Sequence, residues 1–178
     1  MNKIKKLNEV DFNNCYILCL CEGKTEWAII DILLDNKKLK FSREALVGEK
    51  VHLRMSGDEL TREFLQFDYD KELIIFRIID SVSENLRIKK PYNRYQVFNF
   101  YTSHEIELVF IHYDNLYKEF EKKKSIVKAS EFYKSQNNNY NKSYEYAINY
   151  LDDIEKLTES IKKSKRKDKL GIYDLMLD

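Results

Sequence analysis

The sequence predicts an α/β fold, in which a mostly parallel sheet of about four strands carries helices on both faces. Apolar runs of strand length recur four times along the chain, and segments with helical spacing of apolar residues separate them. The order strand, helix, strand, helix, strand, loop, strand, helix is typical of a parallel sheet with crossover connections. A chain of 178 residues is long enough to bury one hydrophobic core.

The first half of the core begins with a buried strand. Residues 15–21 form an apolar run, and the residues from Trp27 to Leu34 are apolar nearly all round, which predicts a largely buried helix. A basic connector over 36–48 follows. Residues 51–55 alternate between apolar and polar types, which predicts a short second strand.

The second half of the core begins at a capping box. Ser56 and Glu59 have the spacing in which the serine accepts from the third backbone N–H and the glutamate reaches back, so a helix should start there. The most apolar run, 72–79, predicts the third strand. A loop over 81–94 then leads to the fourth strand, 96–100.

The C-terminal part is predicted to be helical. One helix is expected from Ser103 to Phe120, and an asparagine tract at 137–141 then interrupts the helical pattern. Residues 144–161 predict a second amphipathic helix, and 170–177 a short final one. The predicted organisation is therefore a polar lead-in (1–13), an α/β core (14–122) and a helical C-terminal extension packed on that core (123–178).

Composition limits the function classes. Charged residues make up 34% and hydrophobic residues 43% of the chain, which is typical of a water-soluble globular protein, and the net charge of +1 gives no global basic field. No signal peptide and no run of membrane-spanning length are recognised, so we expect a cytoplasmic protein without membrane contact. Cys15, Cys19 and Cys21 share one face of the first strand, where buried apolar packing is favoured over a metal site because no fourth ligand is evident.

Two parallel strands each end in an acidic residue. Glu22 follows the first strand and Asp80 the third, and ligands of open α/β sheets bind at the carboxyl ends of the strands. Mg²⁺ prefers oxygen ligands and often uses one or two carboxylates together with substrate phosphates. The sequence therefore predicts a Mg²⁺ or Mn²⁺ site at Glu22 and Asp80. Glu84 in the following loop is a further candidate ligand, and Glu26, one helical turn from Glu22, is an alternative one.

Several other residues could contact a substrate. Lys24 could offset phosphate charge, although Gly23-Lys24-Thr25 is not a Walker loop because Leu18 stands where its first glycine should be. His104 and Glu107 lie near the start of the helix that follows the fourth strand, where Glu107 could instead simply favour the helix dipole. The basic residues of the run 162–169 could bind phosphates or form a solvated helix end. The candidate substrate-binding residues in this run are Lys165, Arg166 and Lys167.

These motifs resemble a known family. The segment Cys19-Leu-Cys-Glu22-Gly23-Lys24-Thr25-Glu26 resembles the first motif of Toprim domains, and Ile-Ile-Asp80 resembles the second. Ser103-His-Glu-Ile-Glu107-Leu-Val-Phe-Ile-His112 and the closing Lys169-Leu-Gly-Ile-Tyr-Asp-Leu resemble segments of RloB-like and AbiL-type abortive-infection proteins. The resemblance covers about residues 15–178.

The resemblance implies a Toprim-like Rossmannoid fold and Mg²⁺-dependent cutting of phosphodiesters in a prokaryotic or phage defence system. Some relatives work with an ATPase partner protein. Glu22 would take the catalytic glutamate role, and Asp80 the role of the first metal-binding aspartate. The second motif of the family is Asp-x-Asp, whereas this chain has Val82 at the second aspartate position.

The sequence is therefore compatible with three functions. The favoured one is a metal-dependent nuclease acting on DNA or RNA. The alternative is a catalytically degenerate Toprim module that binds a protein partner or nucleic acid without cleavage, which Val82 and the near-neutral charge favour. The third is a flavodoxin-like receiver with Asp80 as phosphoryl acceptor, against which the lack of a clustered acidic pair next to Asp80 counts. The oligomeric state is left open.

Overall fold

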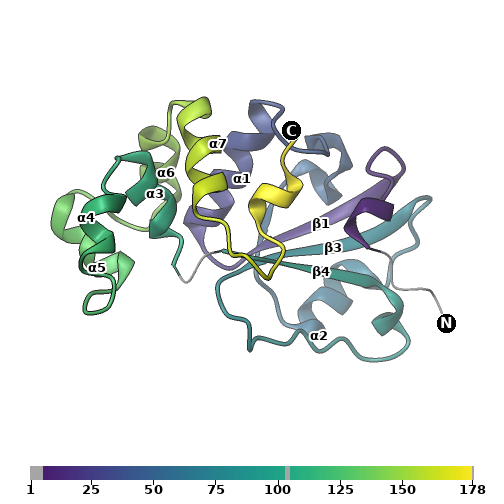
Figure 1. Cartoon of the computed structure of the whole chain (residues 1–178). Helices are drawn as coiled ribbons and strands as arrows, with labels where there is room; N and C mark the ends of the chain where they lie inside the picture. Colours follow the sequence, from purple (N-terminus) through teal and green to yellow (C-terminus); the bar gives the residue numbers. More distant parts are fainter. Residues whose placement is uncertain (1–5, 103–104, 178) are drawn as a thin grey trace.

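The computed structural model describes residues 6–102 and 105–177. Its centre is a four-stranded, all-parallel sheet with the strand order β2-β1-β3-β4 (Figure 1). The strands are β1 (Cys15–Cys21), β2 (His52–Leu53), β3 (Glu72–Ile79) and β4 (Gln96–Tyr101). The predicted α/β class is confirmed, and the bounds of β1 and β3 agree with the predicted strands.

The strand register brings four carboxyl ends to one edge of the sheet. Cys21 pairs with Leu53 on one side and Ile78 on the other, and Ile79 pairs with Tyr101. The residues that directly follow β1, β3 and β4 therefore lie next to one another. This edge positions the candidate site, as expected for an open parallel sheet.

Helices cover both faces of the sheet, but unequally (Figure 1). One face packs on α1 (Lys24–Asp35), and the core on this side continues into the C-terminal helices, most of which lie beyond the end of the sheet in Figure 1. Ile17, Cys19 and Cys21 point into this larger core. The other face packs on α2 (Gly57–Leu60), the single π-helical turn Thr61–Leu65 and part of the loop between β3 and β4, with Leu18 and Leu20 pointing there. The alternation follows from the period of two in a strand.

The first strand's three cysteines follow the predicted face. Cys15, Cys19 and Cys21 are all buried in the larger core, and none of them forms a disulfide. They pack there as small apolar residues.

The capping box that the sequence predicts at Ser56 is present. The Ser56 hydroxyl accepts from the backbone N–H of Glu59 (3.3 Å), and the Glu59 carboxylate accepts from the backbone N–H of Ser56 (2.7 Å). Gly57, the first residue of α2, lies so close to another loop that an added Cβ would be 1.8 Å from the carbonyl oxygen of Arg87.

The single helix predicted from Ser103 to Phe120 is wrong in its extent. Residues 103–104 lie outside the described part of the chain. Beyond them the structure has two helices, α3 (Glu107–Tyr113) and α4 (Tyr117–Glu121). Asn115 adopts a left-handed conformation (φ 59°) between them, so the chain turns there while both helices still bury apolar side chains.

The helix predicted over 144–161 is also divided. It consists of α6 (Tyr144–Tyr150) and α7 (Ile154–Lys163), and the Asp153 carboxylate caps α7 by accepting from the backbone N–H of Lys156 (3.0 Å). An unpredicted helix, α5 (Ala129–Gln136), precedes them. The predicted final helix is one 3₁₀ turn, Ile172–Leu175.

The remaining connections contain short 3₁₀ turns. These are Leu7–Glu9, Arg43–Ala45, Val47–Glu49 and Tyr92–Arg94. Within the described ranges, no helix combines the length and the apolar character needed to cross a lipid bilayer.

Candidate active site

Glu22 and Asp80 meet at the carboxyl edge of the sheet. The backbone N–H of Glu22 donates to the carbonyl of Ile78 (2.9 Å), which extends the pairing of β1 with β3 by one residue. The backbone N–H of Asp80 donates to Glu22 Oε2 (2.9 Å). The structure therefore brings Glu22 and Asp80 together, as expected from their positions directly after adjacent parallel strands.

The two carboxyl groups interact electrostatically. Partial burial, followed by a hydrogen bond with Glu22 and the negative charge of Glu22, raises the pKa of Asp80 above its ordinary value. A like charge held nearby disfavours the ionisation of Asp80, and a cation placed between the two carboxylates would relieve that repulsion. This is the electrostatic property that a divalent-cation site requires.

Arginines occupy part of the same edge. Arg54 follows β2, and its Nη1 lies 3.1 Å from Glu22 Oε1 and 3.7 Å from Glu84 Oε2. Glu84 also pairs with the buried Arg77, which in turn donates to Asn99 Oδ1 (3.1 Å). Glu84 thus has two guanidinium partners, and its predicted role as a metal ligand stays a prediction.

Glu26 is a buried acid at the start of α1. Its side chain is folded over Gly23, where an added Cβ would be 2.7 Å from Glu26 Oε2, so a larger residue at position 23 would require the carboxylate to shift. Burial is the main cause that raises the pKa of Glu26 to about 7, and the charges of Glu22 and Glu107 add to it. A carboxyl group of this kind can exchange a proton near neutral pH.

Glu107 is fully buried in the first turn of α3. Its Oε1 accepts from the hydroxyl of Tyr140 (2.8 Å) and lies 2.8 Å from Lys142 Nζ. Its Oε2 is buried without a hydrogen-bond partner in the described part of the protein. Such an atom is costly to leave unsatisfied, which marks Glu107 as more than a helix-dipole residue.

Lys142 joins the acids into one cluster, and sequence reasoning missed it. Burial opposes its charge, but the hydrogen bond with Glu107 and the charges of Glu107 and Glu26 raise its pKa. Its positive charge also offsets part of the rise in the pKa of Asp80, which burial and Glu22 cause. Tyr140 lies in the asparagine tract and Lys142 directly follows it, more than thirty residues after Glu107, where no local pattern singles them out.

The other predicted substrate residues are placed differently. Lys24 is the exposed first residue of α1, and His104 lies outside the described residues. Lys165 packs its ammonium group on the ring of Tyr173 (3.8 Å to the centroid), Arg166 is half-buried, and Lys167 is exposed.

The basic run nevertheless ends at the same edge of the sheet. The backbone N–H of Tyr101 at the end of β4 donates to the carbonyl of Leu170 (2.7 Å). A small cavity of about 30 Å³ lies between β4 and the run, lined in part by Thr102, Lys165 and Arg166. The buried hydroxyl of Thr102 has no partner within the described ranges.

The donor set for a metal ion is small. In residues 6–102 and 105–177, no group of three or more His, Cys, Asp or Glu side chains has an arrangement that could hold a metal ion. Glu22 and Asp80 are two adjoining carboxylates, a set that fits Mg²⁺ or Mn²⁺ when water and substrate phosphates provide the other oxygens.

Comparisons with known proteins add no assignment. No protein-family model matches the chain, and searches of curated proteins and of solved structures return no match. The description of the fold and of the acidic edge therefore rests on the structure of this chain alone.

Proposed function

We propose that this protein is a metal-dependent nuclease that hydrolyses phosphodiester bonds at the carboxyl edge of its sheet. The observation that supports the proposal is the adjacency of Glu22 and Asp80, where one carboxylate accepts from the backbone of the other residue (2.9 Å) and raises its pKa. An acidic pair in this position attracts a divalent cation, and a nucleic-acid phosphate brings further oxygens.

Each part of the edge would have a distinct role. Glu22 and Asp80 would hold Mg²⁺ or Mn²⁺, which when bound supplies Lewis-acid polarisation of the phosphate. Glu26, with a pKa of about 7, would accept or return a proton. The basic residues 165–167 beside the end of β4 would bind flanking phosphates of the substrate strand.

The resemblance to Toprim domains supports the same proposal. The Glu22-Gly23 turn after β1 and Asp80 after β3 occupy the positions that the two motifs would take. On the basis of this resemblance we propose that the protein acts in a prokaryotic or phage defence system, as RloB-like and AbiL-type proteins do, and that it works with an ATPase partner.

The test is a cleavage assay on plasmid DNA, single-stranded DNA and tRNA with Mg²⁺, Mn²⁺ or excess EDTA. We expect cleavage that requires the metal and is lost in Glu22→Ala and in Asp80→Ala. The matched control is Asp58→Ala, which removes an exposed carboxylate at the start of α2 that pairs only with Lys89 in the described structure. Retained cleavage in both edge variants would refute the proposal.

A second candidate is a Toprim module that binds nucleic acid or a protein partner without cutting. Val82, at the position of the family's second aspartate, is a 43% exposed apolar residue, and arginines already neutralise Glu22 and Glu84. This candidate predicts binding that is independent of divalent metal, and no change of melting temperature on adding Mg²⁺ or Mn²⁺.

A further inference from the structure

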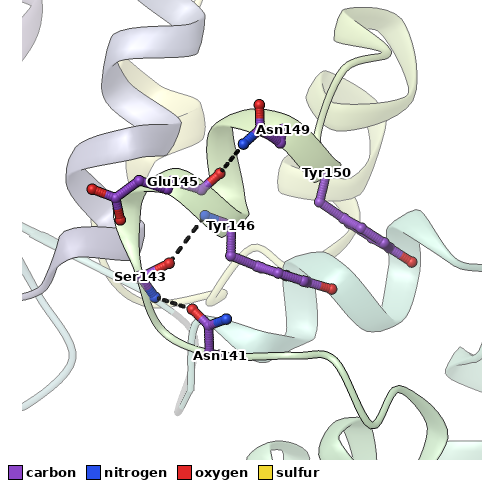
Figure 2. Close-up of a pocket in the computed structure, with 6 residues that line it drawn as sticks. All are labelled: Asn141, Ser143, Glu145, Tyr146, Asn149 and Tyr150. Atoms are coloured by element: carbon purple, nitrogen blue, oxygen red, sulfur yellow. Dashed lines mark hydrogen bonds between the residues drawn. The ribbon is translucent and has the colours of Figure 1, made fainter.

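The short segment before α6 holds Lys142 in a fixed place. Asn141 Oδ1 accepts from the backbone N–H of Ser143 (3.0 Å), and Ser143 Oγ accepts in turn from the backbone N–H of Tyr146 in the first turn of α6 (3.0 Å). Figure 2 shows both hydrogen bonds, which fix the residues on either side of Lys142. The backbone at Lys142 is therefore held by side-chain contacts that are typical of a turn and a helix start.

The same segment packs against the starts of two helices. The Tyr140 hydroxyl donates to Oε1 of Glu107 in the first turn of α3 (2.8 Å). The ring centroid of Tyr144 lies 5.1 Å from that of Trp27, near the start of α1. Because these two contacts come from residues on either side of Lys142, they place Lys142 between the N-terminal ends of α1 and α3.

The starts of α1 and α3 flank the end of β3. Helix α1 follows β1 and helix α3 follows β4, and β3 lies between these two strands in the sheet. Asp80 directly follows β3, and the positive charge of Lys142 acts on both Asp80 and Glu26. The ammonium group is therefore close enough to interact with the carboxylates at this end of the sheet.

Lys142 is anchored, but its ammonium group keeps room for a ligand. Its Nζ lies 2.8 Å from Oε1 of the fully buried Glu107, whereas the side chain of Lys142 is 61% exposed. Glu107 is its only ion-pair partner among the described residues, and an ammonium group has three N–H donors. Burial opposes the charge, but Glu107 raises the pKa of Lys142, so the group stays protonated. Donors therefore remain for a negatively charged ligand.

Arg54, which follows β2, is engaged more fully than Lys142. Its Nη1 lies near two of the carboxylates proposed as metal ligands, Glu22 (3.1 Å) and Glu84 (3.7 Å). The partner of Lys142 is Glu107, which is not one of the proposed ligands. A phosphate that approaches a metal ion at the edge can therefore accept from Lys142 without separating the ammonium group from a metal ligand, and a compact ammonium charge suits a phosphate oxygen.

We propose that Lys142, held in place by its ion pair with Glu107, donates to a phosphate oxygen of the nucleic acid that binds at the acidic edge. The inference rests on the proposed nuclease function, because it adds a substrate contact to the same site. The alternative is that Lys142 serves only as the counter-ion of Glu107. In either case, removing Lys142 alone would leave a buried charge without its partner and would lower stability, so the test has to separate binding from stability.

The experiment measures how binding depends on salt, and it requires no cleavage. The full chain is titrated in Ca²⁺ into labelled single-stranded DNA, duplex DNA and RNA of one sequence, and fluorescence anisotropy of the tightest-binding nucleic acid is followed over a series of KCl concentrations. Glu107→Gln is compared with Glu107→Gln/Lys142→Gln, so that no unpaired buried carboxylate is created. We expect the loss of Lys142 to lower affinity about 10-fold at low salt. It should also reduce the slope of log affinity against log salt by about 0.7 for a single strand or about 0.9 for a duplex, because one phosphate contact is lost.

The matched control is Lys134→Gln in the same background. It removes an exposed lysine of α5, which lies away from the sheet in Figure 1, and should leave affinity and slope nearly unchanged. Lys142→Arg keeps the positive charge and should retain the slope. If Glu107→Gln does not fold, the same comparison is made between wild type and Lys142→Gln.

The outcomes separate this inference from the nuclease proposal. An unchanged slope after loss of Lys142, an equal reduction in the Lys134→Gln control, or no binding of any of the three nucleic acids would overturn the inference, even if Mg²⁺-dependent cleavage is found. A slope that is reduced only by loss of Lys142, in a protein that shows no cleavage, would support the inference and refute only the nuclease.

Discussion

Replacing Glu26 by glutamine should stabilise the protein in a strongly pH-dependent way. Glu26 is 7% exposed, and burial raises its pKa from 4.5 to about 7. Above pH 7 the folded protein must keep a buried charge that the unfolded chain exposes to water, whereas a glutamine carries no such charge.

The magnitude follows from proton linkage. A pKa that rises from 4.5 to about 7 on folding corresponds to roughly 3 kcal/mol, at about 1.36 kcal/mol per pKa unit. Since the folded state binds the proton more tightly, this stability is fully present below pH 4.5 and is lost as the pH rises through 7. Glu26→Gln should therefore raise the free energy of unfolding by up to about 3 kcal/mol at pH 8, or about 6–12 °C in melting temperature, and change it little at pH 4.

The assay is urea unfolding of wild type and variant between pH 4 and pH 8. The matched control is Glu131→Gln, which makes the same change in the first turn of α5 at an exposed position and should alter stability by less than about 0.5 kcal/mol at every pH. A difference between Glu26→Gln and wild type that does not grow with pH would refute the account of Glu26.

Two further predictions concern stability and use the same urea measurement. Tyr140→Phe removes the hydroxyl that donates to the buried Glu107 carboxylate and should lower the free energy of unfolding by about 1.5–3 kcal/mol. The control Tyr92→Phe, whose hydroxyl has no described partner, should leave it nearly unchanged. Equal effects of the two changes would contradict the role of this hydrogen bond. Gly57→Ala would place a Cβ 1.8 Å from the carbonyl oxygen of Arg87 and should cost about 1–3 kcal/mol, so an unchanged urea midpoint would show that the two loops do not meet as described.

The strands could be predicted because their signals are local. The run 15–21 is apolar, ends at an acid and a glycine, and is buried on both faces of the sheet, so its composition alone predicts its extent. The same holds for 72–79. The proximity of Glu22 and Asp80 then follows because adjacent parallel strands have their carboxyl ends at the same edge of the sheet. It can be predicted without knowledge of any tertiary contact.

The helix boundaries were harder to predict because apolar spacing continues across the breaks. Val109, Phe110 and Phe120 are all buried, although Asn115 turns the chain between them. Asp153 is a residue type that favours a helix start, so the sequence did contain a sign of the break before α7. The regular spacing of apolar residues hid this sign, because Leu151 and Leu157 on either side of Asp153 are both buried.

The part of the site that could not be predicted depends on tertiary structure. Lys142 and Tyr140 reach Glu107 only because the segment before α6 packs on the helices beside the sheet. The raised pKa of Glu26 likewise depends on burial and on the charges of Glu22 and Glu107, which lie outside its helix. Sequence periodicity carries no information about such contacts.

The central claim is that Glu22 and Asp80 together hold one divalent cation. Its most direct test is Mn²⁺ binding followed by electron paramagnetic resonance, with wild type compared with Glu22→Gln, Asp80→Asn and the control Asp58→Asn. We predict one bound Mn²⁺ per chain in the wild type and in the control, and loss of that binding in both edge variants. No binding by the wild type, or equal binding by all four proteins, would contradict the account.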